Sequence, residues 1–143
     1  MLNINLKTIS TVIQSSTLLD NDFFINGAGI DSRQNLNKKL FIAIKGENFD
    51  GHDFIDEAIG NGAIAVISEK DIESKVPVLK VSNSIKALGK IANWYRKSLD
   101  IKVIGITGSN GKTTTKNMLN NILSQSSSTF ATLGNLIIIL VFH

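Results

Sequence analysis

Residues 105–114 have the composition of a phosphate-binding loop, reading Gly-Ile-Thr-Gly-Ser-Asn-Gly-Lys-Thr-Thr. An apolar run precedes them and a helical pattern follows, an order that arranges backbone N–H groups around a polyphosphate. Gly108 and Gly111 allow the close approach that a Cβ would prevent. We expect Lys112 to pair with the β- and γ-phosphates and the Thr113 hydroxyl to hold Mg²⁺.

The loop departs from the strict pattern G-x-x-x-x-G-K-[ST] at one position. That pattern requires glycine at position 106, which is Ile106, and Gly105 lies one residue too far upstream. The alternative is a turn between a strand and a helix that binds nothing. The apolar run before the loop and the Lys-Thr-Thr-Thr opening of the helix favour phosphate binding. The candidate nucleotide-binding residues are Gly108, Ser109, Asn110, Gly111, Lys112, Thr113 and Thr114.

The segments around this loop predict an α/β fold. Short runs rich in Ile and Val indicate strands, and apolar residues at helical spacing indicate helices. The near-continuous apolar run before the loop is typical of a buried parallel strand. The expected strands are residues 40–44, 63–67, 76–81 and 101–107, and the expected helices are residues 52–61, 85–99 and 112–123. We place a boundary near residue 82, which gives domains at residues 1–82 and 83–143.

Composition excludes several classes of function. The chain has 143 residues and no cysteine, so disulfides and thiolate chemistry are excluded. Its net charge of +3 comes from scattered lysines and arginines, which does not indicate nucleic-acid binding. The N-terminus lacks the pattern of a signal peptide. The longest apolar run, residues 136–142, is too short to span a membrane. We therefore expect a cytoplasmic protein without membrane insertion.

Several motifs resemble the Mur ligases. The variant loop T-G-S-N-G-K-T-T is the form found in that family and in its folylpolyglutamate synthetase relatives. Asp31-Ser32-Arg33 resembles the D-S-R motif of the uridine-binding domain. Residues 40–55 are similar to the family's stretch L-F-x-A-x-x-G-x-x-x-D-G-H-x-F-I. The resemblance covers nearly all of residues 23–135, with the motifs in the family's order.

The resemblance implies a small N-terminal uridine-binding α/β domain, followed by the first part of a P-loop-type parallel-sheet ATPase domain. Residues 44–49 and 113–118 look most like the member that joins D-Ala-D-Ala to UDP-N-acetylmuramoyl-tripeptide, by way of an acyl phosphate. The alternatives are a ligase that adds the third stem amino acid and a non-catalytic UDP-sugar or nucleotide-binding module. A generic P-loop ATPase would leave the motifs in residues 31–55 unexplained.

The resemblance also assigns roles to residues. It implies ATP and Mg²⁺ as cofactors, Lys112 and Thr113 as catalytic residues, Thr113 as a metal ligand, and a monomer. The residues implied to contact the UDP-linked substrate are Asp31, Ser32, Arg33, Thr132 and Asn135. Asp31-Ser32-Arg33 could instead form a turn with an exposed ion pair. For His52 we favour a structural role, in capping a helix or bonding in a turn, over catalysis.

Residues 137–143 break the resemblance, since the family continues with a polar segment where this chain reads Ile-Ile-Ile-Leu-Val-Phe-His. We interpret this tail as a frameshifted end, which the gene sequence would test; the alternative is a genuine buried strand. On this interpretation the second domain is incomplete. We then expect an inactive fragment that is poorly soluble beyond its first module.

Overall fold

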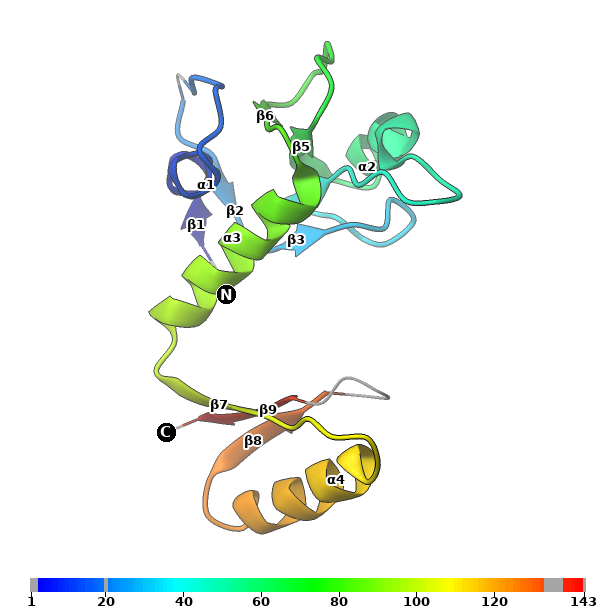
Figure 1. The fold of residues 1–143 in the computed structure, drawn as a ribbon. Coiled ribbons are helices and arrows are strands. Elements are labelled where there is room, and N and C mark those ends of the chain that lie inside the picture. The colour runs from blue at the N-terminus through cyan, green and yellow to red at the C-terminus, as the bar shows by residue number, and fades with distance from the viewer. Residues whose placement is uncertain (1–2, 20, 133–137, 143) are drawn as a thin grey trace. The chain divides into compact units, whose positions relative to one another are not determined.

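The computed structural model describes residues 3–19, 21–132 and 138–142. They form two compact units, Met1–Trp94 and Tyr95–His143 (Figure 1). The division falls within helix α3 (Ser84–Ser98), because Ala87, Leu88, Ile91 and Trp94 on this helix pack on the first unit. The assignment of residues 1–82 and 83–143 to two functional domains stays a prediction.

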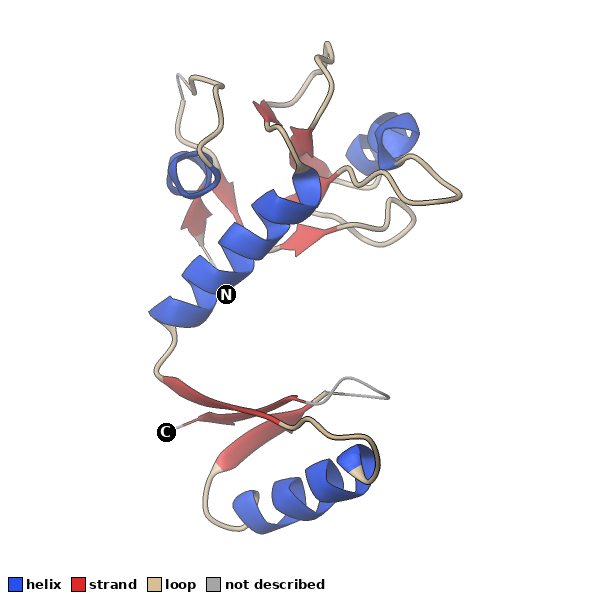
Figure 2. Cartoon of the chain, in the orientation of Figure 1, coloured by secondary structure: helices blue, strands red, loops and turns tan. Residues whose placement is uncertain are grey.

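The first unit is built on a four-stranded parallel sheet, which agrees with the predicted α/β fold, although its first strand was not among those expected. The strand order is β3-β4-β5-β6, and all three neighbouring pairs are parallel. Figure 2 shows these strands in red with helices in blue on their flanks. The strands are β3 (Ala28–Gly29), β4 (Lys39–Ile42), β5 (Ala63–Ser68) and β6 (Val78–Lys80).

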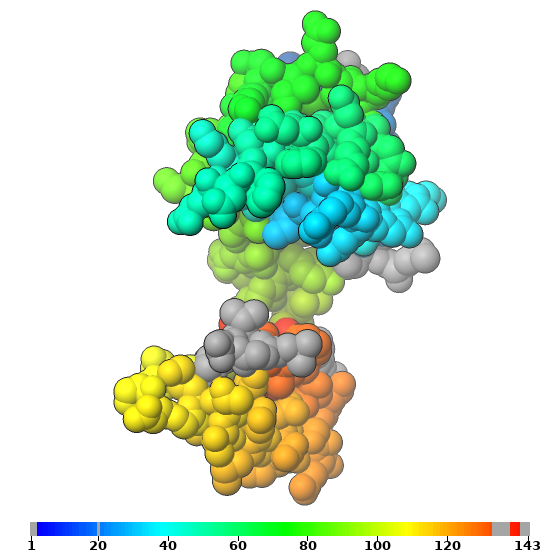
Figure 3. All heavy atoms as spheres, turned by 90° about the vertical axis from the view of Figure 1, so that its right-hand side faces the viewer, coloured from blue at the N-terminus to red at the C-terminus, as the bar shows by residue number. Residues whose placement is uncertain are grey.

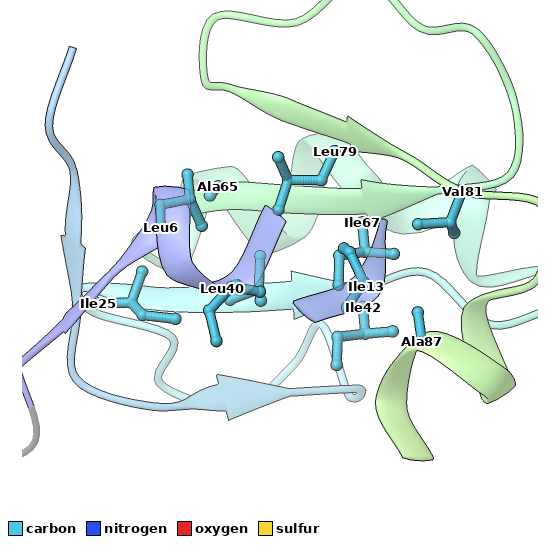
Figure 4. Close-up of a cluster of buried hydrophobic side chains, with 11 residues drawn as sticks. Leu6, Ile13, Ile25, Leu40, Ile42, Ala65, Ile67, Leu79, Val81 and Ala87 are labelled. Atoms are coloured by element: carbon cyan, nitrogen blue, oxygen red, sulfur yellow. The ribbon is translucent and has the colours of Figure 1, made fainter. Parts of the chain in front are cut away.

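Alternation along β4 divides the core of this unit into two apolar clusters. Leu40 and Ile42 face one cluster with side chains of α1 (Leu6–Ile13) and α3 (Figure 4). Phe41 faces the other, with Ile55 and Ala58 of α2 (Ile55–Gly60). Successive strand residues point to opposite faces, so a strand covered on both sides is apolar throughout. The sheet therefore lies between two helical layers.

The N-terminal elements were not predicted. Strand β1 (Ile4–Asn5) pairs antiparallel with β2 (Phe24–Ile25) and leads into α1. Asn5 caps this helix by accepting a hydrogen bond from the Lys7 N–H. The helix buries Leu6, Ile9 and Ile13 at helical spacing. The cap and the spacing were the available signals, whereas Ser and Thr within the helix weaken its propensity.

The predicted helix over residues 52–61 is present in two parts. A 3₁₀ turn, η1 (Gly51–Phe54), comes first and continues into α2. The strand predicted at residues 76–81 is confirmed as the shorter β6. Pro77 precedes β6 and accepts a hydrogen bond from the Val66 N–H through its carbonyl, so it joins the sheet without needing an N–H of its own.

The second unit packs one helix on a three-stranded sheet. Its elements are β7 (Ile101–Gly105), α4 (Lys112–Leu123), β8 (Ser128–Ala131) and β9 (Ile138–Phe142), with the strand order β7-β9-β8. The helix has the predicted bounds. The run Ile138–Phe142 is a strand, and the frameshift hypothesis for its origin stays a prediction.

The strand before the loop differs from its expected surroundings. It pairs antiparallel with β9, and so does β8, so β7 and β8 share one direction and the strand between them is reversed. The expectation of a parallel neighbour and a buried run at residues 101–107 is wrong for this strand, which ends at Gly105. Helix α4 contacts β8 and β9. Ile139 is fully buried, whereas Val103 and Phe130 are exposed. The apolar run thus forms a strand covered on one side.

No helix among the described residues is long and apolar enough to cross a membrane.

Candidate functional site

The loop before α4 has the backbone form that a phosphate site requires. Gly108 and Gly111 have φ angles of +154° and +72°, which residues with a Cβ rarely adopt. Gly111 is the N-cap of α4, and no side chain occupies the cap position. The first turn carries no acidic residue. The N-terminal N–H groups and positive dipole end of α4 therefore face open space without a competing carboxylate.

The Lys112 ammonium lies over this loop. Its Nζ donates hydrogen bonds to the carbonyl oxygens of Gly108 and Ser109, at 2.7 and 3.4 Å. Ser109, Asn110, Thr113 and Thr114, the other predicted ligands here, are exposed. The yellow atoms of the loop and of the start of α4 lie at the molecular surface (Figure 3). The structure thus brings the predicted loop residues together at an accessible surface, and their binding of phosphate stays a prediction.

An open pocket of about 670 Å³ lies in the first unit and contains the Asp31-Ser32-Arg33 motif. Its other walls come from β4, η1, α2 and the loop between β4 and η1. The residues that line it are Ile30, Asp31, Ser32, Arg33, Phe41, Ile44, Gly46, Glu47, Asn48, Phe49, Gly51, Phe54 and Glu57. This mixture of apolar walls and a few polar groups is typical of a small-molecule site.

Asp31 and Arg33 form a bidentate ion pair at the pocket. The Arg33 Nε and Nη2 atoms donate to the two Asp31 carboxylate oxygens at 2.8 and 2.9 Å. These bonds, with one from the Arg33 N–H, lower the pKa of the Asp31 carboxyl and the pair raises that of the Arg33 guanidinium. The Arg33 side chain is 79% exposed. The turn and ion pair foreseen as an alternative are present, and they leave Arg33 accessible to a ligand.

Ser32 is held by a residue that the sequence reasoning missed. Its hydroxyl donates to the Glu57 carboxylate at 2.6 Å, and its carbonyl accepts from the Asn61 side chain at 2.8 Å. Glu57 lies within the predicted helix 52–61 and Asn61 at its end, and nothing in the local sequence links either residue to Ser32. Glu57 and Asn61 therefore fix the position of the motif in the pocket.

The pocket wall at residues 45–50 is a narrow loop closed by backbone contacts. The Gly51 N–H donates to the Ile44 carbonyl at 2.9 Å, and the Gly46 N–H donates to the Phe49 carbonyl at 2.8 Å. A Cβ on Gly51 would lie 2.7 Å from the Ile44 nitrogen. Glycine at position 51 therefore lets the two ends of the loop approach each other.

We expect Gly51→Ala to lower the free energy of unfolding by about 1–3 kcal/mol, because the added methyl meets rigid backbone. Gly60→Ala is the matched control, since a Cβ there meets no atom within 4 Å. Gly60 ends α2, so alanine should leave stability unchanged or raise it by about 0.5–1 kcal/mol. Urea unfolding of both variants measures this, and equal losses would contradict the close contact at Gly51.

His52 has a structural position next to this pocket. Its side chain is 3% exposed, its Nδ1 lies 2.5 Å from an Asp50 carboxylate oxygen, and its Nε2 accepts from the Glu69 N–H at 3.0 Å. Because Nε2 is an acceptor, Nδ1 carries the proton and donates to Asp50. The other Asp50 oxygen accepts from the Lys70 ammonium at 2.9 Å. His52 thus joins η1 to the end of β5, in agreement with the structural role favoured for it.

Asp50→Asn should destabilise the chain at neutral pH. Hydrogen bonds from Lys70 and from the backbone and ring of His52 hold the pKa of the Asp50 carboxyl well below its usual range. Because the pKa is lower in the folded than in the unfolded chain, the ionised Asp50 carboxylate stabilises the fold at pH values above the ordinary pKa of aspartate. This stabilisation is lost as the pH falls through the folded-state pKa. Thermal melts should show a lower melting temperature for the variant than for the parent at neutral pH, and this difference should narrow below about pH 4. A difference in melting temperature that does not depend on pH would contradict stabilisation by the ionised carboxylate.

The two remaining candidate substrate residues lie after β8. The Thr132 N–H and hydroxyl both donate to the Ile138 carbonyl, at 3.0 and 3.2 Å, so Thr132 closes the connection to β9. Its carbonyl accepts from the buried Lys116 ammonium of α4 at 2.6 Å. Asn135 lies outside the described residues. Thr132 is thus anchored to the helix that follows the phosphate loop.

For a metal ion, the described residues offer the exposed Thr113 hydroxyl beside the loop. No group of three or more acidic or histidine side chains gathers in the described part of the chain. The hydroxyl suits Mg²⁺, which keeps several waters and is commonly held by one or two protein ligands together with substrate phosphates.

Comparison with known proteins assigns both units to one family. Residues 24–96 match the model described as Mur ligase family, catalytic domain, and residues 106–138 match the Mur ligase middle domain. The chain belongs to the Mur ligase family. The two matches contain the Asp31-Ser32-Arg33 pocket and the phosphate loop respectively, so the resemblance seen in the motifs is confirmed.

Individual Mur ligases show how much of an enzyme this chain represents. It is 40% identical over 136 residues to the UDP-N-acetylmuramoyl-tripeptide–D-alanyl-D-alanine ligase of Buchnera aphidicola, covering 95% of this chain and 30% of the relative. It is 43% identical over 114 residues to the UDP-N-acetylmuramoyl-L-alanyl-D-glutamate–2,6-diaminopimelate ligase of Aquifex aeolicus, covering 78% and 24%. The chain therefore spans less than a third of the length of these relatives.

Solved structures agree. MurF from Acinetobacter baumannii has a TM-score of 0.80 at 33% identity, with 93% of this chain and 30% of that chain covered. MurF from Thermotoga maritima in complex with ADP has a TM-score of 0.70 at 42% identity, with 76% and 25% covered. The fold is that of the N-terminal region of MurF.

Proposed function

We propose that this chain supplies the UDP-sugar-binding and phosphate-binding parts of an ATP-dependent amide ligase of peptidoglycan precursor synthesis. The ligase would join D-Ala-D-Ala to UDP-N-acetylmuramoyl-tripeptide by way of an acyl phosphate. The observation that carries the proposal is the open N-terminus of α4, with Gly108, Gly111 and Lys112 around it, in a chain that also holds the Asp31-Ser32-Arg33 pocket.

The loop residues are suited to hold a triphosphate. The N–H groups at the start of α4 would donate to phosphate oxygens, and Lys112 would leave the Gly108 carbonyl to neutralise their charge. ATP, when bound, supplies the phosphoryl group that activates a carboxylate. Thr113 would offer its hydroxyl to Mg²⁺. A relative of the chain is known in complex with ADP, which supports nucleotide binding at this loop.

The first unit would hold the UDP-linked substrate. The exposed guanidinium of Arg33 could pair with a diphosphate, since a planar fork of N–H groups matches phosphate oxygens. Ser32, oriented by Glu57, lies beside it. The apolar walls, which include Phe49 and Phe54, would pack on the nucleoside. Such an enzyme would work as a monomer in the cytoplasm, where its nucleotide substrates are found.

The ligase that adds the third stem amino acid is the second candidate, because a relative of that type is 43% identical. Its alignment covers 78% of this chain, against 95% for the D-alanyl-D-alanine ligase of Buchnera aphidicola. The wider coverage favours D-Ala-D-Ala addition. A non-catalytic binding module is the third candidate.

Calorimetric titrations with separate ligands test the proposal. We expect UDP-N-acetylmuramoyl-tripeptide and Mg·ATP each to bind. We also expect the tripeptide form to bind more tightly than UDP-N-acetylmuramoyl-dipeptide, which the third-residue ligase would use. Tighter binding of the dipeptide form would favour the ligase that adds the third stem amino acid. Binding of the UDP-sugars with no binding of Mg·ATP would favour the non-catalytic module.

A further inference from the structure

The phosphate loop contains Asn110-Gly111, one of three Asn-Gly pairs in the chain, with Asn26-Gly27 and Asn61-Gly62. Asparagine is thermolabile, most of all before glycine, because no side chain then hinders the following backbone nitrogen. We propose that Asn110 is a site of spontaneous deamidation and that this modification disables the phosphate loop. The second part rests on the proposed function, whereas the modification itself does not.

The chemistry needs only water. The Gly111 backbone nitrogen loses its proton and attacks the Asn110 side-chain carbonyl carbon. A C–N bond forms, and the side-chain nitrogen leaves as ammonia, which carries away the proton. Water then opens the resulting five-membered imide at either carbonyl, giving aspartate or isoaspartate. Overall, asparagine and water give an acid and ammonia, with no oxidation or reduction.

The structure leaves this pair open to reaction. Asn110 and Gly111 are both exposed, and they lie between a strand and a helix rather than within either. Within the described part of the chain, neither the Asn110 side-chain amide nor the Gly111 N–H makes a hydrogen bond. A Cβ built on Gly111 would meet no atom within 4 Å. Among the described residues, no hydrogen bond to the Asn110 amide or the Gly111 N–H must therefore break before the imide ring closes.

The other two pairs are held in place. The Asn61 amide donates to the Ser32 carbonyl at 2.8 Å, and the Gly62 N–H, which would be the nucleophile, donates to the Ile59 carbonyl at 3.0 Å. The Asn26 amide, oriented to satisfy its neighbours, donates to two backbone carbonyls at 3.0 and 3.3 Å. Each of these pairs must open locally before it can react. The fold therefore directs the reaction to Asn110.

Either product harms a phosphate site. Aspartate puts a negative charge two residues before Lys112, where the ligand is a polyanion. Isoaspartate adds a carbon to the backbone and displaces the N–H groups at the start of α4. A bound phosphate would accept from the Gly111 N–H and order the loop, so an occupied loop reacts more slowly than an empty one.

Ageing the purified chain in warm, mildly alkaline buffer tests this, with peptide mass mapping of all three pairs. We expect Asn110 to convert about 30-fold faster than Asn26 or Asn61, since each of those must first break about two hydrogen bonds. Mg·ATP should slow the conversion of Asn110 alone. Equal rates at the three pairs would overturn the proposal.

ATP titrations before and after ageing test the consequence. The fraction of chains that bind ATP should fall in step with the conversion of Asn110. The Asn110→Gln variant forms the imide ring more slowly, so its ATP-binding fraction should stay at the value measured before ageing. Asn110→Asp should bind about tenfold more weakly than the unaged chain. Full ATP binding by converted chains would overturn the second part. Absence of ATP binding by the fresh chain would refute the proposed function and leave the peptide map standing.

Discussion

Replacing Lys112 with alanine is expected to weaken Mg·ATP binding by about 10- to 100-fold, the usual size of a charge-assisted hydrogen bond to a ligand. The ammonium lies at the loop and, among the described residues, bonds to the loop carbonyls of Gly108 and Ser109 at 2.7 and 3.4 Å, so it is available to phosphates. Its removal should not change UDP-sugar affinity, because that pocket lies in the first unit. Calorimetry with each ligand measures both effects.

Two variants control this experiment. Lys102→Ala removes an exposed lysine of the same unit outside the loop, and it should keep ATP affinity within about twofold. Lys112→Arg keeps the charge but changes its shape, so it should bind ATP between the parent and the alanine variant. If Lys102→Ala and Lys112→Ala lost the same affinity, net charge rather than the loop would be responsible.

Replacing Phe41 with alanine should lower the free energy of unfolding of the first unit by about 3–5 kcal/mol. Phe41 is 1% exposed and packs with Leu36, Ile55 and Val66 under α2. The loss is a large part of the stability of a small domain, which is about 5–15 kcal/mol. Urea unfolding followed by fluorescence of Trp94, the one tryptophan, measures it, because Trp94 packs on the core of this unit.

Phe49→Ala is the matched control, because Phe49 is 74% exposed and, like Phe41, lines the pocket that contains Asp31-Ser32-Arg33. Its unfolding free energy should stay within about 0.5 kcal/mol of the parent. Its affinity for UDP-N-acetylmuramoyl-tripeptide should fall, since an exposed aromatic side chain at the pocket loses its contact with the ligand. Equal destabilisation by the two variants would contradict the burial of Phe41.

Sequence reasoning located the elements that carry strong periodicity. Helix α4 has the predicted bounds because Gly111 marks its start and polar residues follow Leu123. The apolar run at Ala63–Ser68 was found because a strand covered on both faces is apolar at nearly every position. Helix α1 was missed because it is short and contains Ser and Thr, although Asn5 caps it.

The pairing of strands from distant segments could not be predicted from local sequence patterns. The residues near Ile101–Gly105 do not indicate which strand pairs with it, and its antiparallel partner β9 lies more than thirty residues later in the chain. The same limit applied in the pocket. Asp31-Ser32-Arg33 was singled out by its motif, but Glu57 supports it from a helix 25 residues away. A hydrogen bond of that kind leaves no mark in either local segment.

The proposed function depends on the binding of nucleotide phosphates by residues 108–114. Amide NMR of the chain during titration with Mg·ATP tests this binding residue by residue. We expect saturable shifts concentrated in the N–H signals of the loop and first turn of α4, and much smaller shifts of the same signals in Lys112→Ala at equal ligand concentration. Saturable shifts confined to other parts of the chain, or no shifts in this loop, would contradict phosphate binding by these residues.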